Sequence, residues 1–578
     1  MLFKRFRVIR TLKEPPAWLG RFHWAVTAFV ALALATVILK SGYGLVPTRA
    51  GLIAVDVLNY LVLGLMLVDV VAGYVYAPSF LEHLKQRWYE LALLVPIVTA
   101  IAAGGTGITF VIGRQIIVVA VAATRSRHAQ TLIRLLTEQP VRLLALSFAA
   151  MIAVGTLLLT LPAATANGRG ATFSDALFTA TSATCVTGLI VQDTPTYFTR
   201  FGQAVILFLI QFGGLGIMTF SASLVALFGR RFGLAARRTY AGLVEEARTI
   251  DLARALRYVL LFTLLAEGAG TVMLFGRWAF DFKNPVEALY CAAFHSISAF
   301  CNAGFSLFTA NLVPYRSDLV VNLTVIGLVV FGGLGFGVVH ELLNRDTLRL
   351  GSRPRRRLSV HTRLVLWTTA ILIVFGTIFF FFAEFDNALS NLNLGTKLLA
   401  SLFQSVTPRT GGFNTVPFDA LRPVTLFVWV MMMFIGASPG GTGGGIKTST
   451  LAILLLAVRS RVSGRQEIEV GQRAIPRDTV YRAAAIAVVS SALVGVVFAV
   501  LLVTERQPFE DILFETASAF GTVGLSAGLT PFLSTAGKLI LSVLMFAGRV
   551  GPLTLALATS RAKPQLPISY PEARIMVG

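Results

Sequence analysis

The sequence has few charged residues for its length, and acidic residues are the scarcer kind. Only 13% of its 578 residues are Asp, Glu, Lys or Arg, whereas 55% are hydrophobic. This balance excludes a soluble globular protein and is typical of a chain that crosses a lipid membrane many times. Lys and Arg outnumber Asp and Glu by 50 to 28. Because basic residues gather on the cytoplasmic side of membrane proteins, topology accounts for this excess, and we expect no nucleic-acid partner.

Cysteine and histidine are also scarce, with three and six residues. Cys185, Cys291 and Cys301 lack metal-ligand spacing and an odd number cannot all pair within the chain, so we expect buried packing residues. No cluster of His, Asp and Glu has ligand spacing either, which argues against a membrane enzyme. No Gly-x-Gly-x-x-Gly motif follows a strand. We therefore expect no enzyme and no cofactor in this chain, and a nucleotide only through a partner subunit.

Long apolar runs, in contrast, are abundant. The candidate spans are 20–40, 51–77, 88–104, 106–123, 141–162, 201–228, 255–276, 318–343, 363–384, 422–457 (interrupted), 478–503 and 536–560. These twelve spans separate seven basic clusters so that all seven can lie on one side, which predicts cytoplasmic termini. The basic opening leads into a full-length span without a small-residue cleavage site, so we expect no cleavable signal.

A short polar segment that ends in glycine recurs four times. Its copies are TSATCVTGL (181–189), HSISAFCNAGF (295–305), FQSVTPRTGGF (403–413) and FETASAFGTVGL (514–525). Aligned on Gly188, Gly304, Gly412 and Gly524, the copies lie 108 to 116 residues apart. Three of the four glycines have serine six positions earlier, namely Ser182, Ser298 and Ser518. A fixed period of this length indicates one structural unit copied four times along the chain.

Each copy lies between two helical elements. A short helix is predicted before each segment, at about 174–184, 286–300, 396–407 and 509–520. Acids near three of these starts (Asp175, Glu287, and Glu510 with Asp511) complement the helix dipole and can cap free amides. An apolar helix with a second glycine follows, at Gly213, Gly332, Gly436 or Gly548, where we expect a close helix crossing. The repeated unit is therefore helix, short re-entrant helix, glycine segment, helix.

Four such segments meeting on one axis predict an ion filter. A cation can enter a bilayer only if oxygen dipoles replace its water, and backbone carbonyls can do so where glycine permits the required angles. The predicted lining triplets are Val186-Thr187-Gly188, Asn302-Ala303-Gly304, Thr410-Gly411-Gly412 and Thr522-Val523-Gly524. The last is the most similar to the filter triplet of tetrameric potassium channels. Irregular backbone at this depth must be buried in protein or line water, as a four-fold pore allows.

The chain from about 135 to 563 resembles the membrane subunit of the Trk/Ktr potassium uptake family. The resembling motifs are EQPVRLL (138–144), CVTGL, FCNAGFSLF (300–308), TPRTGGFNT (407–415), GASPGGTGGGIKTST (436–450), FGTVGLSAGLT (520–530) and FAGRVGP (546–552). The resemblance implies an all-α polytopic membrane protein with four pseudo-repeats of helix, pore helix, filter and helix around a central pore. It also implies K+ at the filter residues, a homodimer in lipid of the bacterial plasma membrane, and gating by a cytosolic nucleotide-binding ring.

Two gate elements follow from the resemblance. The second helix of the third repeat is broken by ASPGGTGGGIKT, whose glycines and proline cannot sustain a helix. The predicted gate residues there are Gly440, Gly441, Gly443, Gly444, Gly445 and Lys447. A phosphate-binding loop is the alternative, but Ile446 stands where that motif needs glycine. Arg549, inside an apolar helix, is expected to reach into the pore as an electrostatic barrier; a structural ion pair is the alternative.

The first 135 residues share no period with the repeats. Residues 68–98 resemble the second and third helices of voltage-sensor-like domains, whereas Arg114 stands alone in the fourth. A single charge couples weakly to voltage, so a structural or dimer-supporting role is favoured over sensing. The predicted domains are 1–135 (four extra helices), 136–245, 246–356, 357–472 and 473–563 (repeats 1 to 4) and 564–578 (a cytoplasmic tail).

Other functions stay open at this point. Thr187 and Gly411 depart from the usual filter pattern, which leaves a sodium-tolerant or sodium-coupled transporter as the alternative to potassium uptake. A receptor with degenerate filters is disfavoured because all four glycines are present. The basic segments 230–238, 345–363 and 459–473 either dock a partner or only fix the topology.

Overall fold

The computed structural model describes residues 140–216, 252–343, 358–465, 467–470 and 473–551, and seven isolated residues between 25 and 68. The predicted N-terminal four-helix unit and the C-terminal tail therefore lie outside the described residues, apart from those seven. The chain forms two compact units, one of residues 1–138 with 160–171 and one of residues 139–159 with 172–578. Every predicted site residue belongs to the second, larger unit.

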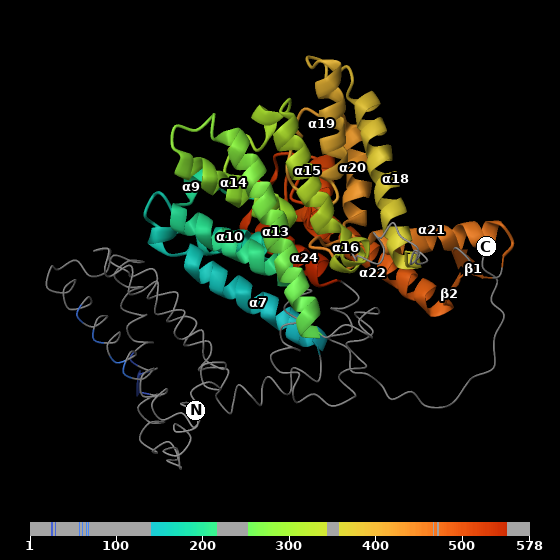
Figure 1. The fold of residues 1–578 in the computed structure, drawn as a ribbon, viewed down its shortest axis with the longest axis horizontal. Helices are drawn as coiled ribbons and strands as arrows, with labels where there is room; N and C mark the ends of the chain where they lie inside the picture. Colours follow the sequence, from blue (N-terminus) through green and yellow to red (C-terminus); the bar gives the residue numbers. More distant parts are fainter. Residues whose placement is uncertain are drawn as a thin grey trace, which may run out of the picture. The chain divides into compact units, whose positions relative to one another are not determined.

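The larger unit is built almost entirely of helices, in four successive sets (Figure 1). The first set is α7 (Pro140–Leu159), short helix α8 (Phe173–Thr184), α9 (Thr194–Tyr197) and α10 (Arg200–Leu215). The second is α13 (Leu252–Trp278), short helix α14 (Pro285–Phe300), α15 (Leu319–Leu334) and α16 (Phe336–Leu343). The third is α18 (Val360–Ala383), short helix α19 (Leu394–Val406), α20 (Pro423–Ile435) and α21 (Thr448–Val462). The fourth is α22 (Arg477–Thr504), short helix α23 (Phe509–Gly521) and α24 (Thr535–Val550).

The remaining regular elements are small. Strands β1 (Ile468–Val470) and β2 (Arg473–Ile475) form an antiparallel hairpin between α21 and α22, with Glu469 opposite Ala474. Single 3-10 turns lie at Pro162–Ala164, Val313–Tyr315 and Thr530–Phe532. The first of these turns belongs to the smaller unit.

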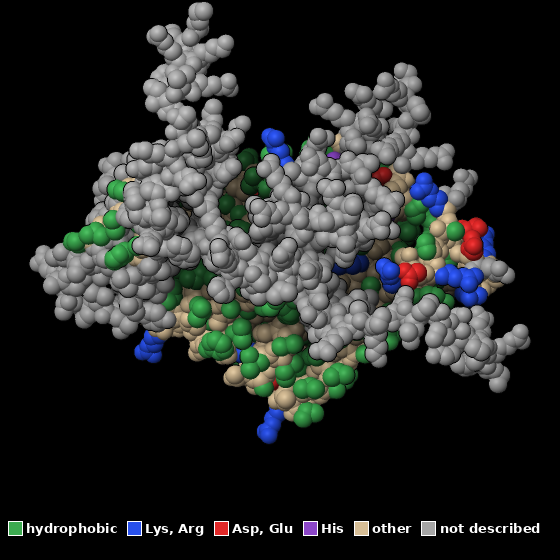
Figure 2. Space-filling model, turned by 90° about the horizontal axis from the view of Figure 1, so that it is seen from below, with side chains coloured by type: hydrophobic (Ala, Val, Ile, Leu, Met, Phe, Trp, Pro, Cys, Tyr) green, Lys and Arg blue, Asp and Glu red, His purple; other side chains and the backbone are tan. Residues whose placement is uncertain are grey.

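Several helices have the length and composition of membrane spans. Among the described residues, α13, α18 and α22 are long and apolar enough to cross a bilayer, and the pair α15 and α16, bent by 104°, counts as a fourth if it forms one span. Trp367 and Phe382 of α18 are 70% and 72% exposed, as expected for side chains that face lipid. Figure 2 shows hydrophobic side chains over much of the described surface, with charged side chains gathered towards the hairpin end. The described unit is thus an all-α, multi-pass membrane fold, as predicted.

The bend between α15 and α16 was not part of the predicted continuous span 318–343. It falls at Gly335, whose φ of +89° a helix cannot contain and which favours glycine. The carbonyl oxygen of Pro439 lies where a side chain at this position would stand. The span is therefore bent where another segment of the chain packs against its backbone.

The apolar core lies between neighbouring sets of helices. One cluster packs Trp429 and Phe380 of the third set against Phe514 of the fourth. A second cluster joins Phe178 of the first set to Phe520 of the fourth. All five of these side chains are fully buried. The short helices are thus held by side-chain packing between sets, which fixes the position of the segments that follow them.

Candidate functional site

The short helices begin close to the predicted positions, and polar neutral residues cap three of them, whereas α23 follows Pro508 without a side-chain cap. The side chains of Thr172, Asn284 and Asn393 accept backbone N–H groups at the starts of α8, α14 and α19. The predicted capping role of Asp175 and Glu287 is therefore wrong. A short neutral side chain at the N-cap reaches these amides, which leaves the carboxylates one turn further on free for other partners.

These carboxylates instead form ion pairs between different sets of helices. Asp175 Oδ1 accepts Lys538 Nζ of α24 at 2.7 Å, and both side chains are largely buried. Glu287 Oε1 accepts Arg200 Nη2 of α10 at 2.8 Å at a more exposed position. The two pairs link the first set to the fourth and to the second, around the ends of the short helices.

The four predicted triplets share one unusual backbone pattern. The first residue of each has a positive φ: Val186 (57°), Asn302 (59°), Thr410 (67°) and Thr522 (50°). The closing glycines also have positive φ: Gly188 (94°), Gly304 (69°), Gly412 (72°) and Gly524 (90°). The middle residues Thr187, Ala303, Gly411 and Val523 are not in this region. Alternating backbone handedness turns successive carbonyls towards the same side, whereas in an ordinary strand they alternate.

The four closing glycines form a closed ring. A methyl group added at Gly304 would lie 2.6 Å from Gly412 Cα, and one added at Gly412 would lie 2.6 Å from Val523 O. A methyl group at Gly524 would lie 2.9 Å from Gly188 Cα, and one at Gly188 would lie 3.2 Å from Gly304 Cα. Each segment therefore meets the next, and the fourth meets the first. The structure brings all twelve predicted filter residues together.

The recurring serine holds each segment to its short helix. Ser182 Oγ accepts the amide of Gly188 at 3.0 Å and donates to Leu189 O at 2.7 Å. Ser298 Oγ donates to Phe305 O at 2.8 Å, and Ser518 Oγ accepts the amide of Gly524 at 3.1 Å. The serine at six positions before the glycine is thus explained by a buried backbone amide or carbonyl that needs a partner.

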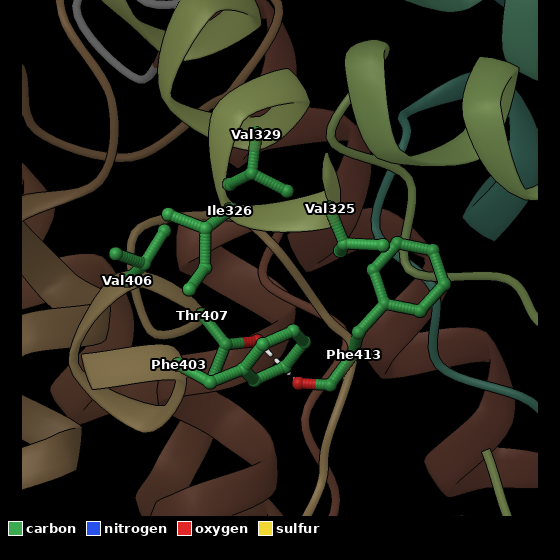
Figure 3. A pocket seen from close by; sticks show the side chains of 7 residues that line it. All are labelled: Val325, Ile326, Val329, Phe403, Val406, Thr407 and Phe413. Atoms are coloured by element: carbon green, nitrogen blue, oxygen red, sulfur yellow. Dashed lines mark hydrogen bonds between the residues drawn. The ribbon is translucent and has the colours of Figure 1, made fainter. Parts of the chain in front are cut away.

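The third segment, which lacks this serine, uses a threonine one position later. Thr407 Oγ1 donates to Phe413 O at 2.5 Å, as Figure 3 shows beside an apolar pocket between α15 and α19. Arg409, the residue just before this triplet, donates to Thr369 Oγ1 of α18 at 3.3 Å. The departure in sequence therefore keeps the hydrogen bond and changes only the residue that makes it.

The second glycines lie where their helices cross the ends of the short helices. A side chain at Gly213, Gly332 or Gly548 would collide with the carbonyl of Thr184, Phe300 or Phe520, each four residues before a ring glycine. The predicted close crossing is confirmed for these three. In the third set, a side chain at Gly436 would instead collide with the carbonyl of Gly444. The helix stops there because Gly436 has a φ of +63°.

The segment between α20 and α21, residues 436–447, lies against the ring residues; we call it the gate loop. Its backbone amides at Ser438 and Thr442 donate to Gly333 O and Gly332 O, each at 3.0 Å. The Gly444 amide donates to Thr522 Oγ1 at 2.9 Å. Gly440, Gly441, Gly443 and Gly445 belong to the same loop, and Gly440 O accepts the amide of Phe336 at 3.1 Å. The structure thus places the predicted gate glycines against the filter residues and the junction of α15 and α16.

The two predicted gate cations bind backbone carbonyls of this region. Arg549, 3% exposed, donates to Thr442 O of the gate loop and to Gly213 O of α10. Lys447 Nζ donates to Gly443 O at 2.6 Å and Gly444 O at 3.2 Å. In the described part of the chain neither forms an ion pair. For Arg549 these contacts favour the predicted position beside the gate loop over a structural ion pair.

Two polar side chains of the candidate site were not identified from the sequence. The side chain of Asn302 was treated only as part of a backbone lining, and Thr442 was not singled out in the gate loop. The side-chain amide of Asn302 and Thr442 Oγ1 lie 3.1 Å apart, and both residues are buried. The repeat alignment carried a signal, since the other three segments have Val or Thr where the second has Asn.

This helical unit, with a ring of glycine segments inside apolar helices, has the architecture of a polytopic membrane transport protein. A family model for TrkH, described as a cation transport protein, matches residues 108–569. The chain therefore belongs to the TrkH family of cation transport proteins. The family consists of transporters rather than enzymes, in agreement with the expectation from the sequence.

Individual relatives agree with this assignment. A Ktr system potassium uptake protein B of Vibrio alginolyticus is 40% identical over 439 residues, which cover 76% of this chain and 94% of that protein. The potassium/sodium uptake protein NtpJ of Enterococcus hirae is 34% identical over 446 residues, covering 76% and 97%. The crystal structure of the potassium transporter TrkH from Vibrio parahaemolyticus matches with a TM-score of 0.61 at 19% identity, covering 82% of this chain and 96% of that one. At that identity the structural likeness supports the fold alone.

Proposed function

We propose that this protein takes up potassium ions across the bacterial plasma membrane, through a pore whose filter consists of the four triplets. The observation that carries the proposal is the closed ring of four segments with the same alternating backbone handedness. Two relatives similar along most of their length are named as potassium uptake proteins of a Ktr system, which supports the choice of ion.

The geometry suits a dehydrated cation. Carbonyl groups that face one axis can replace the water that a cation loses, without any charged side chain at the ring. The four short helices end one to four residues before the triplets, so their partly negative carboxyl ends lie near the filter segments. Potassium would bind to backbone oxygens of Val186-Thr187-Gly188 and the three equivalent triplets.

We propose that the gate loop and Arg549 obstruct this pathway. The loop contacts the filter residues Thr410 and Thr522 from one side, and two cationic side chains lie beside it. Fixed positive charge on the path of a cation is a barrier, so conduction requires the loop and Arg549 to move. We propose that a cytosolic nucleotide-binding ring drives this movement in a homodimer whose termini are cytoplasmic.

Flux measurements on the purified protein in proteoliposomes test this function. We expect potassium flux that exceeds sodium flux, rises in an Arg549→Gln variant and is absent from protein-free vesicles. Flux of neither ion, in the wild type and in the Arg549→Gln variant alike, would contradict the proposal.

A sodium-tolerant or sodium-coupled transporter is the second candidate. The 34% identity to a relative named as a potassium/sodium uptake protein supports it, over nearly the whole of that relative. The ratio of potassium to sodium flux separates the two candidates. A ratio near one, or potassium flux that requires sodium on the same side, would favour the second.

A further inference from the structure

Three successive residues of the gate loop meet three different filter segments. Thr442 Oγ1 lies 3.1 Å from the side-chain amide of Asn302 in the second segment. At Gly443 there is room only for hydrogen, since an added methyl group would lie 2.8 Å from Thr410 Cβ of the third segment. The Gly444 amide donates to Thr522 Oγ1 of the fourth segment at 2.9 Å.

The filter residues in these contacts occupy one position of the repeat. Asn302, Thr410 and Thr522 are the first residues of their triplets, all have positive φ, and all are fully buried. β-Branched residues such as Thr410 and Thr522 rarely adopt this backbone conformation, which persists only where the surroundings hold it. Hydrogen bonds from the gate loop are part of those surroundings.

Asn302 joins the loop to two filter segments at once. When its amide is oriented by its partners, Nδ2 donates to Thr442 Oγ1 at 3.1 Å and to Phe300 O at 3.2 Å. Oδ1 then accepts Thr410 Oγ1 at 2.9 Å, across to the third segment. Movement of Thr442 would therefore leave a buried amide with one partner fewer, at a residue whose backbone belongs to the filter.

The first segment has no such contact with the loop. Val186 occupies the equivalent position and its side chain cannot form hydrogen bonds. The loop reaches the first set of helices through Arg549, which donates to both Thr442 O and Gly213 O. The loop is thus tied to the filter at three of the four segments, and to α10 by the arginine.

We propose that these contacts form a latch between the gate loop and the filter, so that the position of the loop sets the ion preference of the filter. Asn302 and Thr522 are positioning residues in this latch, and Thr442 is its partner on the loop. When the loop leaves the axis, the first residues of the triplets lose hydrogen bonds that hold their strained backbone. The inference rests on the proposed filter and gate, and adds that gating and selectivity are coupled.

The experiment compares Thr442→Val with Thr442→Ser in proteoliposomes, by measuring potassium and sodium flux without any partner protein. Valine keeps the shape of threonine and loses the hydroxyl, whereas serine keeps the hydroxyl. Loss of one hydrogen bond should raise potassium flux about 2- to 10-fold. It should also lower the ratio of potassium to sodium flux in the same variant. Thr442→Ser should keep both values close to those of the wild type. Thr522→Val, at the fourth segment, should change both values in the same direction.

Thr271→Val is the matched control, because Thr271 Oγ1 donates only within α13, to Glu267 O at 2.7 Å. Increased flux in Thr442→Val at an unchanged ion ratio would overturn the latch while leaving the gate intact. Unchanged values of both would also overturn it. Absence of potassium flux even in Arg549→Gln would instead contradict the proposed function itself, so the two failures are distinguishable.

Discussion

Replacement of Gly304 by serine should disrupt ion selection by the ring. Its φ of +69° costs a residue with a side chain about 1–2 kcal/mol. The new Cβ would also lie 2.6 Å from Gly412 Cα and 3.0 Å from Gly412 C. These neighbours are backbone atoms, so no side-chain rotation can relieve the contact and the ring must shift. Overpacking of this kind costs about 1–3 kcal/mol more.

Strain of this size is large compared with the energies that separate potassium from sodium. A change of about 1–2 kcal/mol alters an equilibrium about 5- to 30-fold. We therefore expect the ratio of potassium to sodium flux to fall at least about tenfold in Gly304→Ser, with a changed potassium flux. The assay is paired potassium and sodium flux in proteoliposomes, after size-exclusion chromatography has verified that the variant is folded.

Gly528→Ser is the control for backbone strain alone. Gly528 has a φ of +100°, but nothing lies within 4 Å of the position that a Cβ would take. It should therefore retain the wild-type ion ratio. A folded Gly304→Ser protein with the wild-type ratio would refute the ring geometry as the source of selection. An equal loss of selection in Gly528→Ser would refute the argument from contact.

Three further variants test separate parts of the site. Ser518→Ala leaves the amide of Gly524 without its partner, at a cost of about 1–3 kcal/mol, and should lower the ratio of potassium to sodium flux several-fold. Arg549→Gln removes charge-assisted hydrogen bonds worth about 1.5–3 kcal/mol, so potassium flux without a partner should rise at least about tenfold; unchanged flux would argue against its role as a barrier. Lys538→Met leaves Asp175 buried without its cation, at about 3–5 kcal/mol, and should lower the thermal unfolding temperature in detergent. The double variant with Asp175→Leu should regain part of that loss, and a double variant less stable than the single would refute the pairing argument.

Features that depend on local rules could be predicted from the sequence. The short helix expected at 174–184 is observed at Phe173–Thr184, because its cap, its apolar face and its polar end are all encoded nearby. The glycines at the helix crossings could be predicted from the sequence in the same way. A helix that passes a backbone carbonyl needs glycine whatever its partner is, so the pattern at Gly213 and Gly548 could be interpreted without knowing what lies opposite.

Contacts between distant segments could not be predicted in this way. Asp175 and Lys538 are 363 residues apart, and nothing in either neighbourhood identifies the other. The period of the repeats indicates that the four segments are equivalent, but not which polar side chain faces which. Asn302 and Thr442, 140 residues apart, belong to different repeats, so their contact exists only once the four units have closed into a ring.

The departure of the third repeat from the common pattern is itself a structural consequence. In the other three repeats the glycine lies inside the second helix, two residues before its end, and packs against a carbonyl at the end of the short helix. In the third, α20 ends at Ile435 and the chain turns at Gly436, so the backbone groups of the gate loop are not used in helical hydrogen bonds. Because a loop can offer its own amides, Gly444 can bind Thr522 of the fourth repeat, which a helix interior could not do. The broken symmetry therefore gives the proposed gate its contacts with the filter, and a strictly four-fold chain would lack them.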